Sequence, residues 1–187
     1  MMFGPGRGAE TRTGFCDEIP ADAIRSARLR AVYAYWRDLG GTLGHLPGRQ
    51  HIDPLALKPH LPFLWMVDAL PAERGVRYRY RLIGTEIVAA RGGDDTGRFV
   101  DEVNRELDDR QEVGARFALV LLNGRAHWRL GPPQWINIIG DRAPYIENIY
   151  MPLAGEDGMA GIILAVNAYY DHSLREIALY GSRRNAL

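Results

Sequence analysis

The sequence predicts an α+β domain in which helices cover one face of an antiparallel β-sheet. Three observations lead to this prediction. The chain has 187 residues, of which 47% are hydrophobic and 25% charged, and this size and composition are typical of a folded domain. Apolar residues alternate with polar ones in some segments and recur at helical spacing in others. Two expected strands precede a group of helical segments and three more strands follow it, an order that favours an antiparallel sheet.

The chain is expected to begin with a flexible tail and a helix. Residues 1–20 are rich in Gly, Pro and Thr and show no periodicity. Residues 21–40 are expected to form an N-terminal helix with one stripe that contains Ile24, Arg28, Ala31, Tyr35 and Leu39. Such a helix packs on its own domain or pairs with the same helix of a second copy.

A hairpin flanked by short helices comes next. Asp53 and Pro54 are typical of a helix start and predict a short helix up to His60. Residues 63–70 and 77–84 read as two strands joined by a Pro/Gly turn. The second strand alternates strictly, with Tyr78, Tyr80 and Leu82 opposite Arg77, Arg79 and Arg81. A second short helix is expected over residues 85–90.

The pattern of apolar residues in the second half of the sequence predicts one longer helix and three strands. The helix is expected over residues 104–122, and the strands over 125–130, 145–153 and 161–170. Trp135–Gly140 either extends a strand or crosses the sheet. Ser173 and Glu176 have the spacing of a capping box, so residues 171–187 are expected to hold a C-terminal helix or tail. Residues 44–170 would then form the main domain.

Charge and composition exclude several classes of protein. Lys plus Arg and Asp plus Glu each number 23, so the basic excess of a nucleic-acid binder is missing. Cys16 is the only cysteine, which excludes an intramolecular disulfide. No apolar run has the length of a signal peptide or of a membrane span. We therefore expect a cytoplasmic protein without a membrane partner.

Motifs of common catalytic and metal sites are missing from the sequence. It contains no Walker loop, no G-x-S-x-G elbow and no H-E-x-x-H helix. His51 and Asp53 offer two metal ligands but no evident third, so no metal is expected. His127 on an expected strand reads as a surface histidine more readily than as a buried pH-sensitive group or ligand contact.

Two groups of polar residues leave their role open. Arg77, Arg79 and Arg81 on one strand face either bind an anion or form a solvated outer face. Polar residues also interrupt apolar strands, and any that points inward needs a partner or a ligand: these are Glu147, Asn148 and Asn167. Their direction stays open because a shift of register by one residue reverses the face.

Several short motifs resemble the PAS domain family, specifically its bacterial, largely stand-alone single-domain proteins. The most specific is YRYRLIGT at residues 78–85, followed by Asp-Thr-Gly-Arg at residues 95–98 before the longer helix. The likeness covers residues 30–170 and also includes Tyr35-Trp36, Ile52-Asp53-Pro54, Leu61-Pro62, Asp68, Asn123-Gly124-Arg125, Tyr150-Met151-Pro152-Leu153 and Gly161–Leu164.

This resemblance implies a five-stranded antiparallel sheet, a cavity between the sheet and the long helix, and a sensory role. PAS domains bind small molecules or partner proteins in signal transduction and commonly form dimers through an N-terminal helix. The cofactor stays unknown. Cys16 lies in the tail rather than where flavin-photosensing PAS domains carry a cysteine, and residues 104–122 lack the histidine usual in haem sensors. Both observations argue against those cofactors.

We therefore expect a non-enzymatic sensory or regulatory domain that signals through a homodimer or a partner protein. The candidate ligand-binding residues are Tyr78, Tyr80, Leu82, Phe117 and Leu121. One alternative is a pure interaction module whose cavity is packed shut. The other is a small enzyme with a cone-shaped α+β fold, in which Glu147 beside Tyr145, or Asp68 with Tyr80, would act as base and hydrogen-bond donor.

Overall fold

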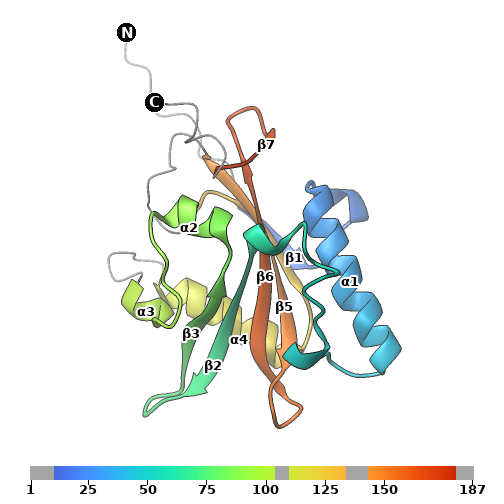
Figure 1. Ribbon diagram of the computed structural model, residues 1–187, viewed down its shortest axis with the longest axis vertical. Helices are drawn as coiled ribbons and strands as arrows, with labels where there is room; N and C mark the ends of the chain where they lie inside the picture. The colour runs from blue at the N-terminus through green and yellow to red at the C-terminus, as the bar shows by residue number, and fades with distance from the viewer. Residues whose placement is uncertain (1–10, 104–109, 134–142, 180–187) are drawn as a thin grey trace.

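A computed structural model describes residues 11–103, 110–133 and 143–179 (Figure 1). Its described part holds one antiparallel sheet with strands in the order β1-β4-β5-β6-β2-β3, and β7 pairs with β6. The strands are β1 (Arg12–Phe15), β2 (Leu64–Pro71), β3 (Val76–Ile83), β4 (His127–Gly131), β5 (Tyr145–Ala154), β6 (Ala160–Tyr170) and β7 (Glu176–Ile177). The five strands β2 to β6 match the expected ones closely, so the predicted α+β class is confirmed.

Helices lie on both sides of this sheet (Figure 1). They are α1 (Ala27–Leu43), α2 (Thr85–Arg91), α3 (Val100–Val103) and α4 (Arg110–Asn123). Helix α1 packs on one face, where Leu29 and Val32 join a core with residues such as Ile149. The other three helices pack on the opposite face, where Phe117 and Val120 of α4 join a second core. None of the described helices is long and apolar enough to cross a bilayer.

The N-terminal helix starts later than predicted and buries a different stripe. It begins after Ser26, whose Oγ accepts a hydrogen bond from the Leu29 N–H. Leu29 and Val32 are fully buried, and the half-buried Trp36 donates from its indole to the Pro152 carbonyl. Ala31, which was expected to be on the packed face, is exposed. The predicted stripe was thus wrong by about one position, because it was anchored on Arg28 rather than on Leu29.

Part of the expected N-terminal tail forms a strand. Residues 12–15 are β1 and pair with the outer edge of β4, with Thr13 opposite Arg129 and Phe15 opposite His127. A four-residue strand is too short to show a clear alternation in sequence. Its register comes from pairing with a strand more than 110 residues away, which local periodicity cannot detect.

Two of the predicted short helices do not form. Residues 54–60 form successive turns instead, because Pro59 and Pro62 lack the amide protons that would continue the helix. After Ser173 the chain reverses, because the Asp171 side chain accepts hydrogen bonds from the Ser173 and Arg175 amides. Glu176 and Ile177 then pair as β7 with β6. The predicted C-terminal helix start was therefore wrong.

Helix α4 corresponds to the expected long helix over residues 104–122, of which residues 104–109 lie outside the described part; α3 precedes that segment, where no helix was expected. Helix α2 agrees with its prediction and ends at Gly92, whose φ of 81° is a left-handed conformation that glycine adopts readily. The uncertain segment Trp135–Gly140 lies outside the described residues.

Candidate functional site

A small internal cavity lies between the sheet and helices α2 and α4. It has a volume of about 40 Å³ and is lined by side chains from seven elements, β2 to β6, α2 and α4. Its lining residues are Trp65, Tyr80, Ile87, Arg91, Val113, Phe117, Arg129, Ile146, Asn148, Tyr150 and Asn167. This is the position at which the resemblance implied a cavity.

Aromatic rings fill most of the space around this cavity. The Trp65 indole lies 5.9 Å, between ring centroids, from each of the rings of Tyr80, Phe117 and Tyr150. Rings at this spacing attract one another beyond the effect of their burial. Three rings from β3, α4 and β5 thus converge on one tryptophan of β2 and form the apolar wall.

Two asparagines beside these rings form a polar part of the cavity wall. Asn148 of β5 and Asn167 of β6 are register partners. The Asn167 Oδ1 accepts hydrogen bonds from the Asn148 amide at 2.6 Å and from the Trp65 indole at 2.9 Å. The Asn167 amide donates to the Tyr169 hydroxyl at 3.2 Å. Hydrogen bonds therefore orient both side chains on the face of the sheet that packs against α4.

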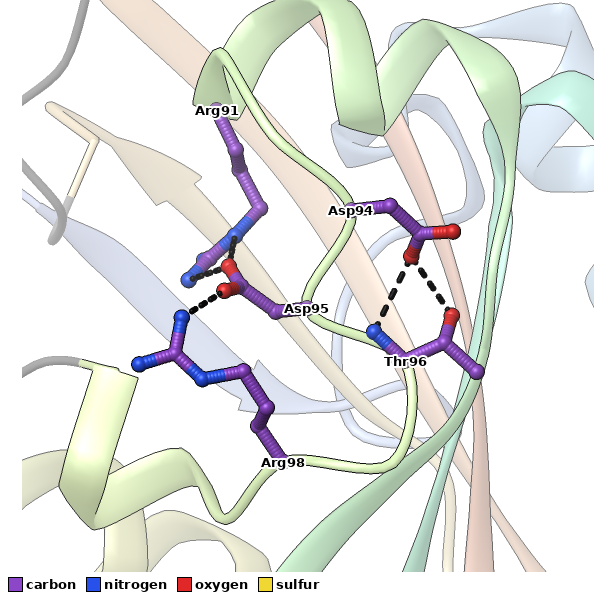
Figure 2. Close-up of polar contacts among 5 residues, drawn as sticks. All are labelled: Arg91, Asp94, Asp95, Thr96 and Arg98. Atoms are coloured by element: carbon purple, nitrogen blue, oxygen red, sulfur yellow. Dashed lines mark hydrogen bonds and ion pairs between the residues drawn. The ribbon is translucent and has the colours of Figure 1, made fainter.

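Two buried arginines also line the cavity. Arg91, at the end of α2, is 9% exposed and Arg129 of β4 is 3% exposed. The Arg91 Nε donates to Asp95 Oδ2 at 3.0 Å, and Arg98 donates to the other oxygen of the same carboxylate at 2.7 Å (Figure 2). Arg129 donates to the Pro132 carbonyl at 2.6 Å. Two guanidinium groups therefore lie in the cavity wall, and the charge of Arg91 is paired with that of Asp95.

The Asp-Thr-Gly-Arg motif positions both Arg91 and Tyr80. Asp95 holds the Arg91 guanidinium, as Figure 2 shows. Gly97, with a φ of 86°, donates its N–H to the Tyr80 carbonyl at 2.7 Å, and the Arg98 carbonyl accepts from the Tyr80 N–H at 3.0 Å. These two backbone bonds attach the loop to β3 at the cavity residue.

The turn that precedes this loop is fixed by Asp94. Its Oδ1 accepts hydrogen bonds from the Thr96 hydroxyl at 2.7 Å and the Thr96 N–H at 2.9 Å (Figure 2). These bonds lower the pKa of the Asp94 carboxyl below its usual value. The Asp-Thr-Gly-Arg motif and the preceding Asp94 thus stabilise the loop that positions Arg91 and Tyr80 at the cavity.

The five predicted pocket residues have different positions. Tyr80 and Phe117 line the cavity. Tyr78 packs edge-on against Phe117 at 5.0 Å and faces a groove outside it. Leu121 packs against the same apolar core without lining the cavity. Leu82 is 42% exposed to solvent, so the expectation that it faces inward was wrong.

A β-bulge explains the position of Leu82. Met66 pairs with Leu82 and Val67 with Tyr80, so Arg81 is an extra residue on β3. A bulge reverses the face of the residues beyond it. Ile83 therefore packs against the core in the place expected for Leu82.

The three arginines of β3 are engaged in ion pairs within the chain. Arg79 and Arg81 both reach Asp68 of β2, at 3.6 and 2.6 Å. Arg77 pairs with Asp101 and Glu102 of α3, both at 2.8 Å. This arrangement agrees with the interpretation of these arginines as a solvated outer face and does not favour an anion-binding site.

The carboxylates considered as catalytic bases lie away from the cavity. Glu147 is fully buried on the α1 side of the sheet, where four donors surround it. They are the N–H groups of Arg25 and Ser26, the Trp128 indole and the Tyr170 hydroxyl, at 2.6–2.9 Å. Asp68 pairs with arginines, as described above.

His127 is buried, which contradicts the surface reading of the sequence. It is 5% exposed, because β1 covers the edge of β4. Its Nε2 lies 3.2 Å from the Thr13 hydroxyl, and its ring packs edge-on against Phe15 at 5.5 Å. Burial, together with the charge of Arg116, lowers the pKa of His127 to about 4.

Sequence reasoning missed most of the cavity lining. Asn148 and Asn167 were recognised as unusual polar residues, but their direction depends on register. No local signal marks Arg91 or Arg129, since the cavity forms only when α2 and β4 come together. Within the described ranges, no three His, Cys, Asp or Glu side chains group as metal ligands.

Three comparisons with known proteins gave different results. A search of curated proteins found no significant match. Similar solved structures include an RNA-binding Light-Oxygen-Voltage receptor, with 14% identity and a TM-score of 0.48 over 96% of this chain. This chain spans 42% of that receptor. The light state of the blue-light photoreceptor Aureochrome1 LOV has 15% identity and a TM-score of 0.39, covering 69% of this chain and 96% of that one.

A family model gives the assignment. The model of the PAS domain matches residues 24–123, which is more than half of the chain. The match begins just before α1 and includes α2 and α4, from which Arg91 and Phe117 reach the cavity. The chain therefore belongs to the PAS family of sensory domains.

Proposed function

We propose that this PAS domain is a sensory module without catalytic activity, which binds a compact, acceptor-rich ligand in the cavity between the sheet and α4. The observation that carries this proposal is the set of donors around one enclosed space. The Arg91 and Arg129 guanidiniums and the Asn148 amide line it together with aromatic rings. A few oriented polar groups in an apolar enclosure are typical of ligand sites.

The charge and size of the cavity narrow the class of ligand. Guanidinium groups only donate hydrogen bonds and pair well with carboxylates. A volume of about 40 Å³ is far below the roughly 300–1,000 Å³ of sites for drug-sized ligands. We therefore propose a small carboxylate, of the size of formate or acetate, as the best-fitting chemistry.

The signal would pass to α1 through the sheet. Neighbouring residues of β5 point to opposite faces, so Asn148 lies at the cavity while Glu147 binds the chain just before α1. A ligand that favours one arrangement of β5 would shift the population of α1 positions. We expect the outcome to be a change at a homodimer or partner interface that includes α1.

A titration followed by NMR tests this proposal. Acetate is expected to shift the indole N–H resonance of Trp65 in a saturable way, because this indole lies in the cavity wall. The Trp128 indole, which binds Glu147 on the other face, is the internal control and is expected to stay constant. Acetamide, similar in size but uncharged, is expected to have no effect. An equal response to acetamide would contradict the proposed anion.

A pure interaction module is the second candidate, and the small cavity favours it. Three rings already contact Trp65, which is the packing expected when the interior serves only as a core. If neither acetate nor formate shifts the Trp65 resonance, this candidate replaces the first one.

A further inference from the structure

A second hollow lies on the surface beside the cavity. It is a groove of about 180 Å³ between β3, α3 and the first half of α4. Its residues are Val76, Arg77, Tyr78, Val100, Asp101, Val113 and Gly114. Val113 lines both the groove and the cavity, so one side chain forms part of the wall between them.

Gly114 keeps this groove open. A Cβ added at Gly114 would meet no atom within 4 Å, and its backbone is not in the left-handed region. Neither close packing nor backbone geometry therefore requires glycine here. Glycine inside a helix costs about 1 kcal/mol relative to alanine. Because Gly114 lines the groove, the missing side chain leaves this part of the groove empty.

Charges at the mouth of the groove are already paired. The Arg77 guanidinium lies 3.7 Å above the Phe99 ring and donates to Asp101 and Glu102 at 2.8 Å each. These contacts lower the pKa of the Asp101 carboxyl, so the pair stays ionised. The rest of the described lining is apolar: Val76, Tyr78, Val100 and Val113. Burying an ionised group against it would be unfavourable.

We propose that this groove binds a neutral, single-ring aromatic molecule. The space of about 180 Å³ is smaller than the roughly 300 Å³ at the lower end of drug-sized sites, which fits one ring with a short substituent. The Tyr78 ring, held edge-on by Phe117, offers an aromatic partner. The groove is a different site from the cavity, so this proposal goes beyond the function proposed above.

The test uses NMR with benzyl alcohol as the probe and the full chain as the sample. Benzyl alcohol is expected to shift the amide resonances of Val100 and Gly114 in a saturable way, while the Trp65 indole resonance changes little. The substitution Gly114→Leu fills the groove and is expected to weaken the apparent affinity by about tenfold or more, equivalent to 1.4 kcal/mol or more.

Two controls keep this test specific. Ala115→Leu adds the same side chain at the next, exposed position of α4, and is expected to leave binding unchanged. Benzoate and benzylamine carry the same ring with opposite charges and are expected to bind more weakly. The proposal is overturned if binding survives Gly114→Leu, if a charged analogue binds more tightly, or if no shift develops up to the solubility limit of benzyl alcohol. Because acetate is tested at Trp65, either site can fail without the other.

Discussion

At the scale of single residues, Asp95 connects the motif that marks the family to the cavity. Its carboxylate joins Arg91 and Arg98, and it is 8% exposed. Asp95→Asn removes the negative charge between two guanidiniums. We expect the free energy of unfolding to fall by about 2 kcal/mol, the range for hydrogen bonds to charged groups. Urea denaturation measures this change.

The neighbouring aspartate gives a matched control. Asp94 accepts two hydrogen bonds from Thr96 through one oxygen, which an asparagine at the same position can also accept. Asp94→Asn is therefore expected to change stability by no more than about 0.5 kcal/mol. Equal effects of the two substitutions would show that Asp95 has no special supporting role.

The bulge in β3 leads to a prediction that reverses the sequence-based one. Leu82 is partly exposed, whereas Ile83 packs against the core. Leu82→Ala is expected to cost less than about 1 kcal/mol, and Ile83→Ala about 2 kcal/mol or more. Thermal or urea unfolding of the two variants measures the difference. A larger loss for Leu82→Ala would mean that the register continues without the bulge.

His127 makes stability depend on pH. Its pKa falls from 6.5 to about 4 on folding, so the unfolded chain binds a proton between these values while the folded chain does not. Stability therefore rises with pH over this window, by up to roughly 3 kcal/mol. Urea unfolding of the wild type and of His127→Gln over the same window is expected to show a shallower pH dependence in the variant. The same pH dependence of the free energy of unfolding in wild type and variant would contradict the burial of a neutral His127.

At the scale of elements, Glu147 attaches the start of α1 to the sheet. It accepts hydrogen bonds from the Arg25 and Ser26 amides as well as from two side chains. Glu147→Gln removes the charge and two acceptor positions, so we expect a loss of about 3 kcal/mol. Amide hydrogen exchange at the start of α1 is expected to accelerate more than exchange in α4.

A second variant separates attachment of the helix from general destabilisation. Tyr170→Phe removes one donor to the same carboxylate and keeps both backbone bonds. Tyr170→Phe is expected to lower the free energy of unfolding. After correction for this global loss of stability, amide hydrogen exchange at the start of α1 is expected to stay close to that of the wild type. Equal acceleration in both variants would refute a specific role of Glu147 in holding α1.

Elements were predictable where their signal is local. Strands β2, β3, β5 and β6 have eight or more residues, long enough for their periodicity to be read directly. Strand β1 has four residues and depends on a distant partner, so its sequence looks like a tail. The turn at Asp171 was misread because its side chain bonds to the backbone in competition with the capping box.

The cavity was predictable only in part for the same reason. Tyr80 and Phe117 were found because they lie on the inner faces of a strand and a helix that the sequence reveals. Arg91 and Arg129 come from elements whose contact depends on the whole fold. A single bulge then reversed the direction of Leu82, and neither composition nor spacing indicates a bulge.

At the scale of the whole molecule, two cores lie on either side of one sheet. One includes α1 and the other includes α4 and the cavity wall. One connection from the cavity to α1 crosses the sheet, where Asn148 and Glu147 are adjacent on β5. Whether the cavity binds a ligand therefore distinguishes a sensory module from a pure interaction module.

Native mass spectrometry of freshly purified protein, compared with the denatured sample, tests whether the cavity holds a ligand. We expect a small mass excess, of the size of a compact carboxylate, that disappears on denaturation and returns when acetate is added to the refolded protein. A bare chain mass in both samples that acetate does not change would contradict ligand binding and leave the packed interaction module as the function of this domain.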